Sequence, residues 1–214
     1  IAFGARALQA DQEPKYLNSP ETAIYHKGAV LYGLAQTRDA VRRRDVVLVV
    51  EGYMDLLSLV QVGIEHVVAT SGTALTEAHC RVLARYAHRV VLLFDGDAAG
   101  STAAMRGLEI LLGTGVDARV VSLPSEHDPD TFVPEKGPDA LLSLAEEGQS
   151  VLDFYMQQLA RSHDLGTMQG KAQAIETLKP LLAKPRDAVR RDLMLREVAQ
   201  RLGVDESALR QEMG

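Results

Sequence analysis

The stretch 90–100, VVLLFDGDAAG, constrains the fold of this chain more than any other. It opens with five consecutive apolar residues, which are too short a run for a helix and predict a strand buried on both faces, as in parallel sheets. Asp95 and Asp97 follow at once, with one glycine between them. Ligands bind at the carboxyl ends of such strands, where two carboxylates this close can converge on a hard cation such as Mg²⁺. A solvated Asp-Gly turn is the simpler interpretation of this stretch taken alone.

Length and cysteine count limit the classes of protein to which this chain can belong. Its 214 residues are enough for one or two domains with a substantial core. Cys80 is the single cysteine, which excludes an internal disulfide framework and a multi-cysteine zinc site within these residues. No apolar run is long enough to span a bilayer, and we expect no membrane partner. Because the chain begins at Ile1 rather than Met, we expect it to be part of a longer protein.

The net charge of −6 is unevenly distributed along the chain. Residues 1–44 carry seven basic and four acidic side chains, a net charge of +3. Residues 45–148 carry six and sixteen, a net charge of −10, and residues 149–214 carry ten and nine, a net charge of +1. An acidic centre beside a basic flank fits cation-dependent phosphate chemistry, because bound divalent ions invert the local field.

The central part of the chain alternates between predicted strands and predicted helices. Short apolar runs, rich in valine, predict buried strands at residues 46–50, 66–69, 90–94 and 116–123. Helical periodicity fills the intervals at residues 55–62, 76–87 and 98–112. This order, β-α-β-α-β-α-β, predicts an α/β fold with a parallel sheet and right-handed crossovers.

The two flanks differ from this centre. We predict short extended pieces at residues 2–8 and 15–19, then a helix over residues 28–44. Further helices are predicted at residues 131–136, 138–147, 151–162, 167–182, 187–202 and 205–213. Gly203 and Asp205 mark a helix stop and a new N-cap. We therefore divide the chain into a basic N-terminal segment (1–44), an acidic α/β domain (45–148) and a helical subdomain (149–214).

Acidic side chains follow three of the predicted strands. These acids are Glu51 and Asp55, Asp95 and Asp97, and Asp128 and Asp130. Because the carboxyl ends of parallel strands lie at one edge of a sheet, we expect the six acids to lie close together. So many carboxylates repel one another unless cations lie among them. Two divalent ions that clamp the attacking and leaving oxygens of a phosphoryl transfer would account for this arrangement.

The basic N-terminal segment contains a second candidate site. Lys15 and Lys27 flank a polar stretch that includes Asn18, Ser19 and Thr22. Lysine charges beside amide and hydroxyl groups form a reasonable phosphate-binding surface. A solvated polar loop explains the same composition equally well.

Several of these motifs resemble a known family. Glu51-Gly52 after one strand and Asp95-Gly96-Asp97 after a later one are typical of the Toprim fold, which primases, topoisomerases and some nucleases share. The RNA-polymerase domain of bacterial DNA primase is similar over almost the whole chain, in the motifs KYLNSPET (15–22), HKG (26–28), EGYMD (51–55), SGTAL (71–75), DGDAAG (95–100) and DPD (128–130). The resemblance implies a Toprim, Rossmann-like parallel sheet, preceded by a short mixed α+β segment and followed by a helical subdomain.

The resemblance also implies an activity. It is the template-directed synthesis of short RNA primers on single-stranded DNA, from ribonucleoside triphosphates and with Mg²⁺ or Mn²⁺. The family pattern assigns the catalytic metal site to Glu51, Asp95 and Asp97. Accessory acidic positions fall on Asp55, Asp128 and Asp130. Positions that handle nucleotide phosphate or template fall on Arg6, Lys15, Asn18 and Lys27.

Location and partners follow from the same resemblance. A primase acts in the bacterial cytoplasm at the replication fork, as part of the primosome. The zinc-binding domain of the family is not matched here, so we expect no zinc in this chain. We expect contacts with the replicative helicase and with single-stranded-DNA-binding protein to be made by parts of the full protein outside this chain.

Two alternatives use the same features. A Toprim nuclease or topoisomerase would cleave DNA, but nothing around Tyr16, Tyr86 or Tyr155 indicates the tyrosine nucleophile that a topoisomerase needs. A Toprim recombination mediator would bind DNA without catalysis. Such a protein need not keep the full acid set, and all six acids are present in this sequence.

Overall fold

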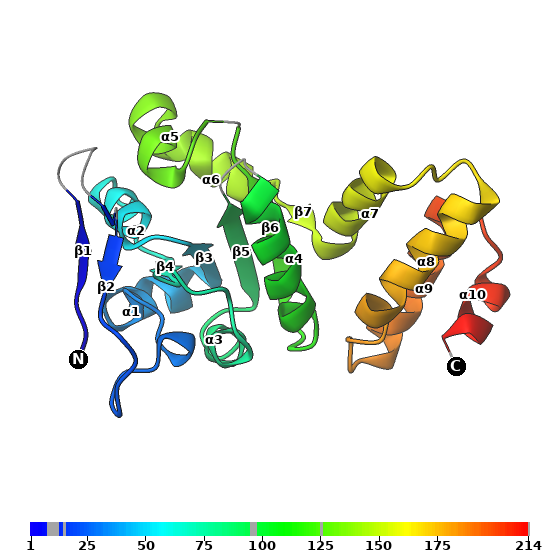
Figure 1. Cartoon of the computed structure of the whole chain (residues 1–214), viewed down its shortest axis with the longest axis horizontal. Coiled ribbons are helices and arrows are strands. Elements are labelled where there is room, and N and C mark those ends of the chain that lie inside the picture. The colour runs from blue at the N-terminus through cyan, green and yellow to red at the C-terminus, as the bar shows by residue number, and fades with distance from the viewer. Residues whose placement is uncertain (8–12, 15, 95–97, 125, 214) are drawn as a thin grey trace.

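A computed structural model of the chain describes residues 1–7, 13–14, 16–94, 98–124 and 126–213 (Figure 1). Its centre is a five-stranded sheet in the order β4-β3-β5-β6-β7. The strands are β3 (Val46–Val50), β4 (Val67–Ala69), β5 (Arg89–Phe94), β6 (Asp117–Ser122) and β7 (Gln149–Ser150). Strands β3 to β6 pair in parallel, which confirms the predicted α/β fold class and its four strands. The short β7 pairs antiparallel with β6 and had no counterpart in the sequence prediction.

Alternate residues of each central strand pack against opposite faces of the sheet. In β5, Val90, Leu92 and Phe94 join one hydrophobic cluster, while Val91 and Leu93 join the other. A strand that is covered on both faces must be apolar throughout, which explains its unbroken hydrophobic run.

Helices cover both faces of the sheet (Figure 1). The first face carries α1 (Leu34–Arg44), α3 (Glu77–Leu83), α4 (Ala98–Leu112) and α7 (Val151–Ser162). The second face carries α2 (Tyr53–Gln61), α5 (Pro129–Lys136) and α6 (Pro138–Glu146). This three-layered arrangement leaves the two ends of the strands as the places where loops gather.

The N-terminal segment forms a small sheet and a short helical turn. Strands β1 (Gly4–Arg6) and β2 (Tyr16–Asn18) pair antiparallel, within the two predicted extended pieces, and the 3-10 helix η1 (Lys27–Ala29) follows. The predicted helix over residues 28–44 was wrong in its first part, since α1 begins only at Leu34. Tyr32 instead exchanges backbone hydrogen bonds with Ala69 of β4, at 2.9 and 3.0 Å. Gly33, with a φ of 85°, then turns the chain into the helix.

The C-terminal helices agree with the sequence prediction. They are α8 (Met168–Leu182), α9 (Ala188–Leu202) and α10 (Glu206–Glu212). Thr167, Asp187 and Asp205 cap their N-termini through side-chain oxygens, and Gly203 ends α9 with a φ of 59°. Apolar residues of α7 to α10 belong to the same hydrophobic cluster as the first face of the sheet, so the tail and the sheet share a core. In the part of the chain that the structure describes, no helix is long and apolar enough to cross a membrane.

Acid should destabilise the fold through His66, which precedes β4. His66 is 4% exposed, and burial, with a contribution from Arg44, lowers its pKa from 6.5 to about 4. The unfolded chain binds a proton that the folded chain excludes. The free energy of unfolding should therefore fall as the pH drops from about 6.5 to about 4, by on the order of 3 kcal/mol. Urea unfolding at a series of pH values measures this effect.

Matched histidine variants test the assignment. His66→Gln should flatten most of the pH dependence, whereas His163→Gln, in the turn after α7, should leave it unchanged. A residual slope is expected, because burial also lowers the pKa of His79. A slope as steep in His66→Gln as in the parent would assign the acid sensitivity to other groups.

Candidate active site

The carboxyl ends of β3, β4 and β5 meet at one edge of the sheet. A cavity of about 240 Å³ lies there, lined by Glu51, Thr70, residues 72–75 and the last residues of β5. Phe94, which lines it, directly precedes the stretch that carries Asp95 and Asp97. Those two acids lie outside the described residues, so their metal-binding role stays a prediction.

Glu51 is the acid, among the described residues, that lines this cavity. It is exposed and follows the last residue of β3. Its backbone oxygen accepts hydrogen bonds from the Ser71 N–H, at 2.8 Å, and from the Thr70 hydroxyl, at 3.5 Å. These bonds hold the loop after β4 against the loop after β3. They fix the point at which the Glu51 side chain leaves the sheet.

Asp55 has a structural contact as well as its predicted metal role. Its Oδ2 accepts a hydrogen bond from the Gly52 N–H at 2.9 Å, in the first turn of α2. A carboxylate at this position also interacts favourably with the positive end of the helix dipole. A Cβ at Gly52 would lie 2.7 Å from this oxygen, so glycine permits the contact. Asp55 therefore helps to start α2 directly after Glu51.

Asp128 and Asp130 belong to the start of α5. The sequence predicted this helix from residue 131, but it begins at Pro129, because proline is well suited to a first helical position. Asp128 is the N-cap and accepts from the Thr131 N–H at 2.8 Å. Asp130 accepts from the Ser58 hydroxyl of α2. Since Ser58 lies one turn beyond Asp55, α2 brings Asp55 and Asp130 into one region.

The described acids do not form a metal site by themselves. Across residues 1–7, 13–14, 16–94, 98–124 and 126–213, no group of three or more histidine, cysteine or acidic side chains is placed to hold a metal ion.

An aromatic cluster seats the β1–β2 hairpin on the start of α2. The Tyr53 ring meets the Tyr16 ring edge-on at 5.8 Å and the Tyr32 ring at 6.0 Å. A Cβ at position 4 would lie 2.9 Å from the Tyr53 ring. The strand β1 can therefore lie this close to Tyr53 only because residue 4 is glycine. The predicted site residue Arg6 places its guanidinium 5.8 Å from the centre of the Tyr16 ring.

A second cavity, of about 350 Å³, lies beside this cluster. Asn18, Tyr53 and Ser71 are among the residues that line it. The hydroxyls of Tyr53 and Ser71 are buried and have no hydrogen-bond partner among the described residues. Buried polar groups normally have partners, so these two hydroxyls can hydrogen-bond a ligand or water. The cavity thus joins the predicted site residue Asn18 to the loop that Glu51 holds.

Lys27 lies in η1, which is fastened to α3 by two side chains that the sequence analysis did not single out. The Thr76 hydroxyl donates to the Gly28 oxygen at 2.6 Å, and His79 Nε2 lies 3.0 Å from the Lys27 oxygen. Thr76 also caps α3, accepting from the His79 N–H at 3.1 Å. The contact between Thr76 and Gly28 spans 48 residues and leaves no local signal in the sequence. Lys15 lies outside the described residues.

Thr76→Val should loosen η1 as well as α3. The substitution removes an N-cap and the bond to Gly28, so we expect a loss of about 1–2 kcal/mol in the free energy of unfolding. Hydrogen exchange of the amides at residues 27–30 should also become faster. Exchange monitored by mass spectrometry, alongside thermal unfolding, measures both effects.

Thr167→Val is the matched control. Thr167 caps α8 in the same way, accepting from the Gly170 N–H at 3.0 Å, but has no bond to η1. It should lower stability by a similar amount while leaving exchange at residues 27–30 unchanged. Equal exchange in the two variants would show that Thr76 does not hold the Lys27 turn.

Comparison with known proteins places this chain in a family. The model of a family described as Toprim-like matches residues 48–133. Models described as the N-terminal domain of the DNA primase catalytic core and as the DnaB-helicase binding domain of primase match residues 1–38 and 152–207. The DNA primase of Legionella pneumophila is 41% identical over 203 residues, which cover 94% of this chain and 35% of that protein. The DNA primase of Clostridium acetobutylicum is 38% identical over 211 residues, covering 98% and 35%.

Solved structures of related proteins have the same fold over almost the whole of this chain. A DNA primase domain from Pseudomonas aeruginosa has a TM-score of 0.91 at 40% identity, covering 100% of this chain and 67% of that one. A DnaG primase catalytic domain bound to single-stranded DNA has a TM-score of 0.88 at 39% identity, covering 97% and 67%. A DnaG catalytic core has a TM-score of 0.87 at 38% identity, covering 98% and 68%.

The parallel sheet with its acid-bearing edge defines a Toprim protein. The chain belongs to the bacterial DNA primase family and corresponds to part of its catalytic core. It spans about a third of the length of the curated relatives it matches. Toprim domains of primases depend on a divalent metal, generally Mg²⁺.

The comparisons change one expectation. We expected the helicase contact to lie outside this chain, but the helicase-binding match covers residues 152–207. The sequence pattern of these helices does not reveal this, because amphipathic periodicity does not distinguish a core-facing surface from a partner-facing one.

Proposed function

We propose that this chain forms part of the catalytic core of a DNA primase. The reaction is template-directed synthesis of short RNA primers on single-stranded DNA, from ribonucleoside triphosphates, by metal-dependent nucleotidyl transfer. The observation that carries the proposal is Glu51 at the sheet edge, on a cavity that it shares with the residues leading into Asp95 and Asp97. The relatives named DNA primase, at about 40% identity, support the same reaction.

The residues at this edge suit Mg²⁺ or Mn²⁺. Glu51, Asp95 and Asp97 supply carboxylate oxygens alone, which hard divalent cations prefer. Asp55, Asp128 and Asp130 are assigned to accessory acidic positions, where they surround the site with negative charge. Zinc has no place in this proposal, since Cys80 is buried and burial raises its pKa to about 12, which keeps the thiol protonated.

In this proposal the side chains divide the work of binding and proton transfer. A divalent ion supplies charge neutralisation on the triphosphate. Glu51 either completes the metal site or accepts the proton of the attacking 3′-hydroxyl. Lys15, Lys27 and Arg6 bind phosphates of nucleotide or template, and Asn18 offers an amide at the rim of the second cavity.

Partners and location belong to the same proposal. The single-stranded template is supported by the related catalytic domain that was solved with single-stranded DNA. A replicative helicase is the proposed partner of α7 to α10, and single-stranded-DNA-binding protein is proposed to act on the full protein. Primer synthesis at the replication fork would take place in the bacterial cytoplasm.

Replacing Asp95 and Asp97 together by Asn should abolish tight divalent-cation binding and leave the fold intact. The amides keep the shape of the carboxylates but remove the charges that attract the ion. Isothermal titration calorimetry with Mn²⁺ measures the affinity, and circular dichroism checks the fold. An unchanged Mn²⁺ affinity in the double variant would show that Asp95 and Asp97 do not bind the metal ion.

Glu51→Gln separates catalysis from metal binding. In the full-length protein, we expect primer synthesis to slow by roughly 10²–10⁴-fold, the usual effect of losing a positioned proton acceptor. Binding of Mn²⁺ and nucleotide should change much less, because Asp95 and Asp97 remain. Incorporation of radiolabelled ribonucleotide on a single-stranded oligonucleotide gives the rate.

Glu147→Gln is the control, because Glu147 is an exposed acid that follows α6 and is not among the acids assigned to the site. It should synthesise primers at the parental rate. Primer synthesis within a few-fold of the parent in Glu51→Gln would make Glu51 structural. Magnesium-dependent cleavage of plasmid DNA by the parent, without ribonucleotide incorporation, would instead favour a Toprim nuclease.

A further inference from the structure

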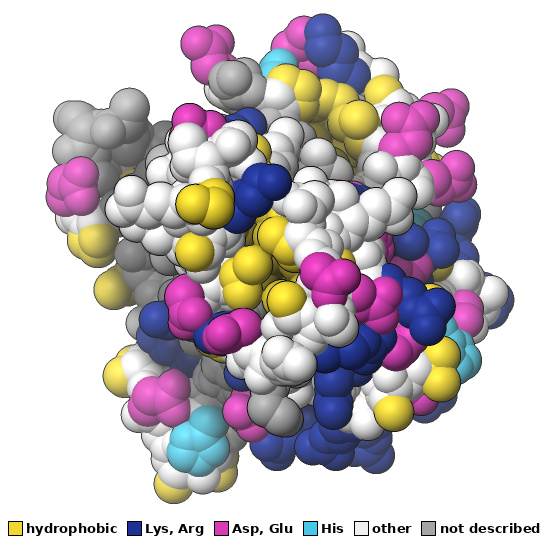
Figure 2. All heavy atoms as spheres, turned by 90° about the vertical axis from the view of Figure 1, so that its right-hand side faces the viewer, with side chains coloured by type: hydrophobic (Ala, Val, Ile, Leu, Met, Phe, Trp, Pro, Cys, Tyr) yellow, Lys and Arg dark blue, Asp and Glu magenta, His cyan; other side chains and the backbone are white. Residues whose placement is uncertain are grey.

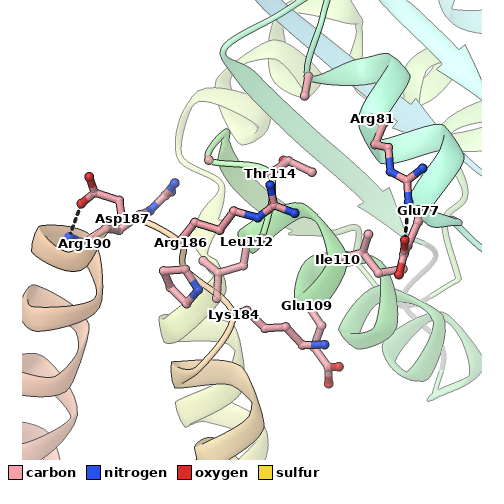
Figure 3. A pocket seen from close by; sticks show the side chains of 14 residues that line it. Glu77, Arg81, Glu109, Ile110, Leu112, Thr114, Lys184, Arg186, Asp187 and Arg190 are labelled. Atoms are coloured by element: carbon pink, nitrogen blue, oxygen red, sulfur yellow. Dashed lines mark hydrogen bonds and ion pairs between the residues drawn. The ribbon is translucent and has the colours of Figure 1, made fainter.

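A larger pocket, distinct from the two cavities described above, lies at the opposite edge of the sheet. Its volume is about 670 Å³, and it is bounded by α3, the end of α4, residues 113–115 and the α8–α9 turn (Figure 3). The turn belongs to the region that resembles the helicase-binding domain, while α3 and α4 belong to the Toprim-like region. The pocket therefore lies at the seam between two parts of the chain with different relatives.

Short contacts hold the two sides of this seam together. The Arg190 guanidinium donates to the Val116 oxygen at 2.8 Å, and a Cβ at Gly113 would lie 3.8 Å from the Lys184 oxygen. Asp187 caps α9, accepting from the Arg190 N–H at 2.7 Å. The hydrogen bond from Arg190 thus holds the start of α9 beside the residues that lead from α4 into β6.

The carboxylates of this pocket are already engaged. Glu77 pairs with Arg81 at 2.6 Å, on the wall opposite the turn. Glu109 accepts from the Tyr155 hydroxyl at 2.7 Å, and burial, with Glu109 itself, raises the pKa of Tyr155, so that this proton stays in place. With Asp187 acting as a helix cap, each acid of the pocket has a hydrogen-bonding partner.

Two basic side chains of the pocket, Lys184 and Arg186, differ from these paired acids. Among the described residues, neither Lys184 nor Arg186 forms an ion pair with a carboxylate. Figure 3 shows Arg186 reaching from the turn toward Thr114 on the far side of the pocket. Figure 2, which looks onto the helical end of the molecule, shows basic side chains gathered in its lower part. Lys184 and Arg186 therefore bring positive charge to the pocket that no carboxylate of the described residues pairs with.

Part of the wall is apolar. Ala84, Ile110, Leu112 and Pro185 line it, and Leu112 is 3% exposed. Pockets of this size that combine an apolar wall with a few charged groups bind small organic ligands. Phosphate recognition suits Lys and Arg side chains, and apolar side chains can pack against the face of a planar base.

We propose that this pocket binds a nucleoside polyphosphate, with its phosphates at Lys184 and Arg186 and its base against Ile110 and Pro185. The site is separate from the catalytic edge. Helix α4 begins directly after the Asp95–Asp97 stretch and ends at the pocket, and its 15 residues span about 22 Å. A ligand here would bridge α4 to the α8–α9 turn, and so join the two regions at their seam.

Binding of ADP to the complete protein in excess EDTA tests the proposal. EDTA removes the divalent ions on which nucleotide binding at the catalytic edge depends, so the assay does not require the proposed primase activity. Calorimetry should show saturable ADP binding in the parent. Lys184→Ala/Arg186→Ala should weaken it at least about tenfold, because two charge-assisted contacts are lost. Arg161→Ala/Lys171→Ala removes the same charge from the tail helices and should leave the affinity unchanged.

Hydrogen exchange locates the ligand. ADP should protect amides at residues 109–115 and 184–187, and should not protect residues 70–75 at the catalytic edge. No saturable binding up to roughly 5 mM ADP, or equal affinity in the Lys184→Ala/Arg186→Ala variant, would overturn the proposal. So would protection at residues 70–75 alone. Protection of the pocket by a single-stranded oligonucleotide but not by ADP would assign it to nucleic acid and overturn it equally.

Discussion

Parallel pairing of β3, β4, β5 and β6 is the constraint on which the rest of this structure depends. Parallel strands end at a common edge, so every loop that follows a strand is delivered to the same side of the sheet. Glu51, the Ser71 loop and the stretch after Phe94 meet there for this reason. The same constraint sends the ends of α3 and α4 to the opposite edge, where the basic pocket lies.

The acids around the catalytic edge illustrate how structural and chemical roles combine. Asp55 and Asp128 each accept a backbone hydrogen bond that begins a helix, and Asp130 joins α5 to α2 through Ser58. Such contacts hold carboxylates in place and offset part of their mutual repulsion. Accessory acids can therefore keep negative charge near a metal site without coordinating the ion themselves.

The tail is joined to the sheet through a continuous core, although its relatives differ from those of the Toprim-like part. Residues of α7 pack in the same cluster as β5 and α4, and Arg190 reaches the backbone before β6. A region that resembles a helicase-binding domain is thus coupled physically to α4, the helix that follows Asp95 and Asp97 in the sequence. The two regions, although they match different family models, share one hydrophobic core.

The sequence by itself determined whatever depends on local pattern. Apolar runs located the four parallel strands, and Gly203 and Asp205 located the boundary between the last two helices, because capping and strand burial leave signals within a few residues. Strand order also placed Glu51 at the carboxyl edge of the sheet. Tertiary structure alone decided the start of α1, where Tyr32 pairs with Ala69, the attachment of Lys27 to His79, and the pocket between α4 and the α8–α9 turn. Each of these joins residues far apart in the chain, and hydrogen bonds between distant segments leave no periodic trace in either one.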